Sequence, residues 1–168
     1  YLIYFSQHLE GFTSQNNHFI HQSEHPLFFQ EIFSQVFLLL CIMPIIHFTT
    51  EQLLRLLEPS YIRGLTLIGG EPMEPENQPV LLELVQAVRK AYGAEKDIWC
   101  YTGCVLETDL LADSPYRCDA TDALLREIDV LVDGPFVEGQ KSLQLAFRGS
   151  ANQRILRKKN GVFTEATQ

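Results

Sequence analysis

Basic side chains are missing from the first 50 residues of this 168-residue chain. That segment has none of the 13 lysines and arginines and only three of the 21 acidic residues, but it has all five histidines. An average soluble protein has about a quarter of its residues charged, so the segment is atypical of one. The net charge of −8 also argues against binding nucleic acid or anionic lipid, because such surfaces need clustered lysine and arginine. We expect small molecules or proteins as partners.

Long hydrophobic runs are also absent. The longest run, Val36 to Ile46, has eleven residues and includes Pro44, whereas a helix that spans a bilayer needs about 20. The run lacks the basic flank of a signal peptide. The four cysteines do not form the pattern of a disulfide framework. We therefore expect a cytoplasmic protein that does not enter a membrane.

The composition changes abruptly near residue 49, after which charged residues are mixed as on an ordinary soluble surface. Three explanations remain open for the first segment: a divergent lobe, an unstructured extension, or a stretch translated in the wrong reading frame. The lack of charge favours the last. We divide the chain into a disordered or mis-framed segment (1–48), a domain (49–157) and a tail (158–168), and we expect the basic residues 157–159 to be solvated.

Helices and strands alternate along the domain. A capping box with Thr49 as N-cap and Gln52 at N3 predicts a helix that ends near Pro59. Strands are expected at 64–68, 97–101 and 128–132. Helices are expected at 80–92 and 121–127, and a brief helix after Gly103 should end near residue 112. The strands start 33 and 31 residues apart, which is the period of a βα unit. An α/β fold with parallel strands in an open sheet or partial barrel follows.

Polar motifs follow all three strands, namely GGEP, YTG and DGPF. The carboxyl ends of parallel strands lie on one rim, where such folds bind ligands. Gly69 and Gly70 allow positive φ and let a ligand approach the main chain, Glu71 adds negative charge, and Pro72 fixes the direction of the exit. The alternative is a tight strand-to-loop turn without a ligand.

Four separated motifs give the chain a resemblance to a known family. LTLIGGEP with the following PENQPVLLELV, DIWCYTG, IDVLVDGPF and FRGSANQRI occur in the order and spacing of the anaerobic ribonucleoside-triphosphate reductase activating proteins. That family is similar to the pyruvate formate-lyase activating enzymes. The resemblance covers about Thr49 to Leu156.

The resemblance implies a partial (βα) barrel of the radical S-adenosylmethionine (SAM) type, whose first part is here replaced by the unrelated segment. In such enzymes three cysteines of a CxxxCxxC loop hold a [4Fe-4S] cluster and leave one iron open for SAM. An electron from a donor such as a flavodoxin-type protein cleaves SAM, and the resulting radical takes hydrogen from a glycine of the reductase. The match places SAM against eight residues: Gly69, Gly70, Glu71, Pro72, Tyr101, Thr102, Gly103 and Asp133.

The chain departs from this family at the cluster. The family's CxxxCxxC loop precedes the segment that matches Thr49, and no such triplet occurs in the sequence. Cys41 could be a first ligand, but Ile45 and Phe48 occupy the next two ligand positions. Cys100 and Cys104 have the first spacing, yet position 107 is a glutamate, so we interpret them as a core residue and a semi-buried thiol. We predict that the cluster is absent and that the chain is inactive.

Two further groups of residues have no specific interpretation. His18, His21 and His25 have spacings usable for a metal, although no carboxylate or cysteine pattern supports a site. Arg148 and Arg154 would meet an anionic ligand or the partner, or form surface ion pairs. The alternatives to an activase are a non-catalytic module that binds SAM or the reductase, and an unrelated α/β protein that uses GGEP as a turn.

Overall fold

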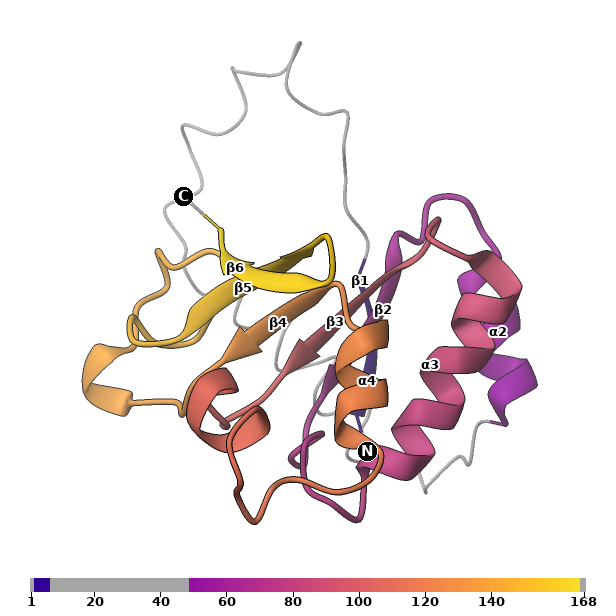
Figure 1. Ribbon diagram of the computed structural model, residues 1–168. Coiled ribbons are helices and arrows are strands. Elements are labelled where there is room, and N and C mark those ends of the chain that lie inside the picture. Colours follow the sequence, from indigo (N-terminus) through magenta and orange to yellow (C-terminus); the bar gives the residue numbers. More distant parts are fainter. Residues whose placement is uncertain (1, 7–48, 167–168) are drawn as a thin grey trace, which may run out of the picture. The chain divides into compact units, whose positions relative to one another are not determined.

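The computed structural model describes residues 2–6 and 49–166, and its elements are labelled in Figure 1. Their order is β1 (Leu2–Ser6), α2 (Thr50–Leu57), β2 (Gly64–Ile68), α3 (Gln78–Tyr92), β3 (Asp97–Tyr101), a π-helical turn (Leu106–Leu110), α4 (Thr121–Glu127), β4 (Val130–Asp133), a 3₁₀ turn (Glu138–Gln140), β5 (Arg154–Lys159) and β6 (Val162–Glu165).

The described strands form one mixed sheet in the order β1-β2-β3-β4-β5-β6. The neighbours β2, β3 and β4 are parallel, with Leu67 opposite Cys100 and Cys100 opposite Leu131, as the βα period predicts. The outer pairs β1–β2, β4–β5 and β5–β6 are antiparallel, which the sequence analysis did not foresee. The fold is therefore α/β with a mixed sheet.

The strand β1 comes from the segment that the sequence analysis set apart. It lies along β2 with Leu2 opposite Ile68 and Ser6 opposite Gly64. Residues 7–48 lie outside the part that the structure describes. The assignment of 1–48 as a disordered or mis-framed segment therefore stays a prediction.

Alternate side chains of the central strands divide between two apolar clusters. Ile98 and Cys100 of β3 and Leu131 of β4 belong to the main core, which also includes buried leucines and valines of α2, α3 and α4. Trp99 of β3 and Val130 and Val132 of β4 form the second cluster on the other face. This division follows from the two-residue period of a strand. The helices thus cover one face, as Figure 1 shows for α3 and α4.

Several predicted boundaries are confirmed. The helix α2 begins directly after Thr49, and β2, β3 and α4 have the expected bounds. The helix α3 starts at Gln78, two residues earlier than predicted. Pro79 fits the first turn of a helix, because an N–H at that position would have no partner within the helix. The helix α3 ends at Tyr92, and the next residue, Gly93, has a φ of 57° and donates from its N–H to Arg89 O at 2.8 Å. The strand that was expected at 128–132 is β4, and it begins at Val130.

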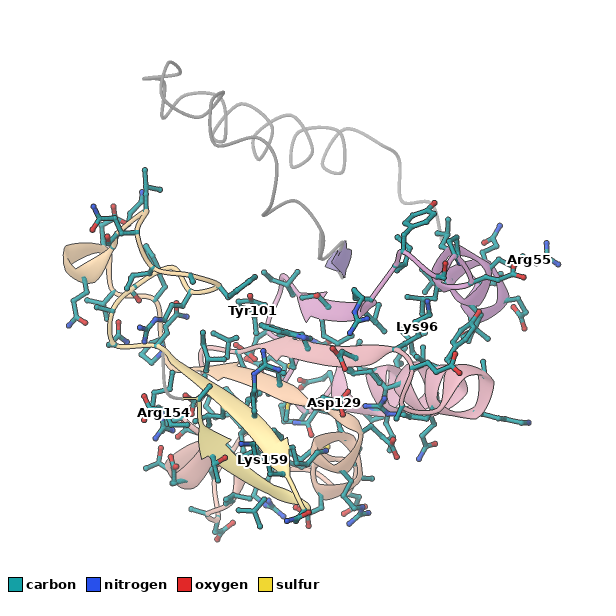
Figure 2. The ribbon with its side chains drawn as sticks, turned by 90° about the horizontal axis from the view of Figure 1, so that it is seen from above. Arg55, Lys96, Tyr101, Asp129, Arg154 and Lys159 are labelled. Atoms are coloured by element: carbon teal, nitrogen blue, oxygen red, sulfur yellow. The ribbon has the colours of Figure 1, made fainter. Side chains whose placement is uncertain are left out.

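At the end of the sheet where β3 and β4 begin, charged side chains form hydrogen bonds to α3 and to the segment after α2. The buried Lys96 donates from Nζ to the carbonyls of Pro59 (2.9 Å) and Ile62 (2.7 Å), just after α2. Arg89 of α3 donates to Asp129 Oδ2 at 2.5 Å, and the same oxygen accepts from Ile98 N at 2.7 Å. Figure 2 shows Lys96 and Asp129 toward one end of the sheet and Tyr101 and Arg154 toward the other.

Residues 158 and 159, where we expected a tail to begin, lie in the sheet, while Arg157 and Lys159 are exposed as expected. Lys158 and Lys159 are part of β5, which continues into β6 through Asn160 (φ 51°) and Gly161 (φ 81°). Positive φ at both positions is the conformation of a tight hairpin turn, for which Asn-Gly is the favoured pair. Lys158 Nζ donates to Leu125 O at 2.9 Å, at the end of α4, where carbonyls attract a cation.

None of the helices in the described ranges is long and apolar enough to cross a membrane.

Candidate functional site

The loops after β2, β3 and β4 meet at one end of the sheet, as expected for parallel neighbours. After β2 the main chain turns through Gly69 (φ 87°) and Gly70 (φ 56°), conformations that glycine adopts without strain. Gly70 is exposed, Glu71 is half-buried and Pro72 is buried. The turn thus places exposed main chain beside a carboxylate.

The Glu71 carboxylate connects the loops after β2 and β3. Its Oε1 accepts from Met73 N (3.0 Å) and from the hydroxyl of Thr102 (2.5 Å). Its Oε2 accepts from Gly103 N at 2.8 Å. Four of the predicted residues, Gly70, Glu71, Thr102 and Gly103, therefore belong to one continuous rim. The negative charge of Glu71 also contributes to raising the pKa of the nearby Cys104 thiol.

The strand β4 ends at this rim with Asp133, which is fully buried. Its carboxylate accepts from Arg154 Nε (2.9 Å), Arg154 Nη2 (2.5 Å) and Leu106 N (2.9 Å). Arg154 also pairs with Glu107 at 2.7 Å and holds the pKa of that carboxyl below its usual range. Of the two open interpretations of Arg154, the structure therefore shows the ion pair.

Main-chain hydrogen bonds connect the second and third loops. Thr102 N donates to Val132 O at 3.0 Å, and Gly134 N donates to Cys104 O at 2.9 Å. Tyr101 is half-buried and packs against the second apolar cluster, on the face away from the helices, and burial raises the pKa of its phenol to about 12. The predicted residues thus lie at the rim. Tyr101 is on the face of the sheet away from the helices, and the buried Asp133 is at the end of β4.

The RGSANQR segment stabilises the loop that follows β4. Gln153 accepts from Gly149 N (2.8 Å) and Ser150 N (3.2 Å) at its side-chain oxygen and donates to Gly134 O at 3.1 Å. Arg148 donates to the Gln153 main-chain carbonyl at 2.9 Å. Sequence reasoning assigned no role to Gln153, because its partners lie up to 19 residues away and a carboxamide has no motif of its own.

Gln78 is a second polar residue that sequence reasoning missed. Its carboxamide nitrogen donates to Met73 O and to Tyr116 O, each at 2.7 Å, and its oxygen accepts from the Thr121 hydroxyl at 2.6 Å. The side chain is fully buried. It holds the exit of the GGEP turn against the segment before α4. Its position in the first turn of α3, next to a proline, was the available signal.

The described thiols do not provide the donor set of an iron–sulfur cluster. Cys100 points into the main core, and burial raises the pKa of its thiol. Burial raises the pKa of the Cys104 thiol to about 11. Within residues 2–6 and 49–166, no group of three or more histidine, cysteine or acidic residues is placed to hold a metal ion. Since a cluster ligand is a thiolate, these residues do not fit a [4Fe-4S] group. Cys41 and the three histidines lie outside the described residues.

The fold and the rim define a class of protein, an α/β domain in which the loops after three parallel strands meet at one end of the sheet. Residues 43–156 match the profile of the 4Fe-4S single cluster domain family. That match covers more than half of the chain, so the chain belongs to this family.

The relatives are more specific. An anaerobic ribonucleoside-triphosphate reductase-activating protein of Vibrio cholerae is 49% identical over 96 residues, which cover 56% of each chain. The protein of that name from Haemophilus influenzae is 40% identical over 113 residues, 64% of each chain. The one from bacteriophage T4 is 36% identical over 115 residues, 68% of this chain and 66% of the relative.

The match thus spans between about half and two thirds of the length of these curated relatives. No solved structure is significantly similar to the chain. The resemblance to the activating proteins, predicted from four motifs, is confirmed.

Proposed function

We propose that the rim binds SAM, and that the domain is the SAM-binding part of an activating protein for anaerobic ribonucleoside-triphosphate reductase. The ammonium group of SAM would lie against the Gly69–Pro72 turn, with Thr102 and Gly103 beside it. The relatives' names support the reductase as partner. A partial barrel of the radical SAM type remains part of this proposal, because it places the ligand at the end of the parallel strands.

One observation carries the proposal. The glycine pair turns the main chain outward at the end of β2 while Glu71 stands beside it, held by donors from the next loop. A carboxylate fixed next to exposed carbonyl groups attracts an N–H cation, because each contact is a charge-assisted or polar hydrogen bond. The α-ammonium group of SAM has this chemistry.

Calorimetry with SAM tests the proposal, and two glycines provide a matched pair of variants. Gly70 and Gly93 both have φ near 57° and both would accept a Cβ in open space. Gly70→Ala and Gly93→Ala therefore each place an alanine at a positive φ of about the same size without a steric clash. We expect Gly70→Ala to weaken SAM binding at least tenfold and Gly93→Ala to leave it unchanged. Equal effects, or no binding by the unaltered chain, would refute SAM binding at the turn.

The family's chemistry is a separate matter. Reductive cleavage of SAM and formation of a glycyl radical on the reductase need a [4Fe-4S] cluster and an electron donor, such as a flavodoxin-type protein. We propose that the 168 residues alone do not assemble this cluster and do not cleave SAM. Anaerobic reconstitution with iron and sulfide tests this, and about four irons per chain with SAM cleavage under dithionite would contradict it.

The second candidate function is a non-catalytic module that binds the reductase. It is favoured by the combination of relatives that activate the reductase with a set of described thiols that does not fit a cluster. Capture of purified anaerobic reductase by the immobilised chain, without SAM cleavage, would support it. Failure of capture in the presence and in the absence of SAM would exclude it.

A further inference from the structure

We propose that Thr102 and Gly103 are positioning residues that present Oε2 of Glu71 to a cationic group of the ligand. The inference rests on the proposed function, because it concerns how the same rim recognises the ammonium group of SAM. It assigns to the loop after β3 a task that is distinct from contacting the ligand itself.

The Glu71 carboxylate has hydrogen-bonding capacity to spare. Two carboxylate oxygens offer about four acceptor sites. Oε1 uses two of them, for Met73 N and for the Thr102 hydroxyl. Oε2 uses one, for Gly103 N. Among the donors that the structure describes, one acceptor site of Oε2 is therefore left for a ligand.

The Thr102 hydroxyl has a defined orientation. Thr102 is buried, and its oxygen accepts from Cys104 N at 3.0 Å. Since a hydroxyl has one proton, accepting from Cys104 directs that proton to Glu71 Oε1 at 2.5 Å. The hydroxyl thus holds Oε1 of Glu71 in place. Because the carboxylate is rigid and planar, the position of Oε2 is then also fixed.

Access to Oε2 depends on Gly103. Gly103 is exposed, and a Cβ at this position would lie 3.4 Å from Oε2. A methyl group there would be in van der Waals contact with this oxygen, and outside residues 102–104 no other described atom would lie within 4 Å of it. The glycine therefore both donates to Oε2 and leaves it approachable.

The ligand chemistry follows from these contacts. An acceptor site on a fixed carboxylate selects an N–H cation, and it gives nothing to a ligand of the same shape without that group. The contribution of Thr102 should therefore appear only with ligands that carry the ammonium group.

The test compares S-adenosylhomocysteine with its deamino analogue, which differ only in that ammonium group. Calorimetry gives the affinity ratio of the two compounds for the unaltered chain, Thr102→Val, Thr102→Ser and Gly103→Ala. We expect a ratio of at least tenfold for the unaltered chain, a ratio about tenfold lower in Thr102→Val, and a preserved ratio in Thr102→Ser, because serine keeps the hydroxyl. Gly103→Ala should also lower the ratio.

The outcomes separate the two proposals. A purely structural role of Thr102 would weaken both compounds equally and leave the ratio unchanged, which would overturn the inference while SAM binding stands. If Thr102→Val folds poorly, Gly103→Ala allows the affinity ratio of the two compounds to be measured with a substitution at an exposed position. An unchanged affinity ratio in Gly103→Ala would also overturn the inference. If SAM itself does not bind the unaltered chain, the proposed function fails together with the inference.

Discussion

The ion pair of Asp133 with Arg154 allows a quantitative prediction for Arg154→Met. Asp133 has no exposed surface, and two of its three hydrogen bonds come from the guanidinium group. Methionine keeps the aliphatic volume but leaves the buried carboxylate with Leu106 N alone. Removing one partner of a buried pair destabilises by about 3–5 kcal/mol. With a urea dependence of about 2 kcal/mol per molar, the unfolding midpoint should fall by about 2 M.

Urea unfolding followed by circular dichroism measures this effect, and a second substitution isolates its cause. Asp133→Asn in the Arg154→Met background removes the unpaired charge, so we expect it to restore at least half of the lost free energy of unfolding. A single variant that loses less than about 1 kcal/mol, or a double variant that is no more stable than the single one, would refute the argument from charge burial.

Three further predictions concern other parts of the fold. Glu107→Gln removes only the half-exposed partner of Arg154 and should lower stability at pH 7 by less than about 1 kcal/mol. Because Arg154 lowers the pKa of Glu107 in the folded state, this contribution exists above the unfolded pKa and disappears as the pH falls through the folded one, so urea midpoints of the two proteins should converge in acid. Gly64→Ala would place a Cβ 2.0 Å from Asp97 O and should destabilise by about 3 kcal/mol, whereas Gly139→Ala, which meets nothing within 4 Å, should not; equal midpoints would contradict this. With a pKa of about 11, about one Cys104 thiol in a thousand is ionised at pH 8, so iodoacetamide should label Cys104 more slowly than the half-buried Cys118, as read by peptide mass spectrometry; faster labelling of Cys104 would show that its loop opens.

The parallel half of the fold could be predicted because its signals are local. Glycine bounds β2 on both sides, Gly93 ends α3, and apolar residues follow the period of each element. The antiparallel flank was missed because the basic residues of β5 were taken for a solvated tail. In the structure Lys158 reaches the carbonyls at the end of α4, and Asn160 and Gly161 were the overlooked turn signal.

The site shows the same difference between local and distant information. The glycine pair after β2 predicts a turn whose main chain a ligand can approach. The sequence gives no sign that Glu71 accepts from Thr102, 31 residues away, or that Asp133 is satisfied by Arg154, 21 residues away. Spacing predicts that these loops share one rim, but it does not specify which side chains on the rim pair with each other.

The order of the strands in the sheet is also their order in the chain. Each strand from β3 onward therefore pairs with the strand made just before it. The connections are α3 before β3, α4 before β4, a loop with the 3₁₀ turn before β5, and a hairpin before β6. During synthesis, an emerging strand would find its partner already in place and would not have to wait for a later part of the chain. The sheet can grow in one direction as the ribosome proceeds, and the rim would be completed before β6 is made, when Arg154 emerges and reaches Asp133.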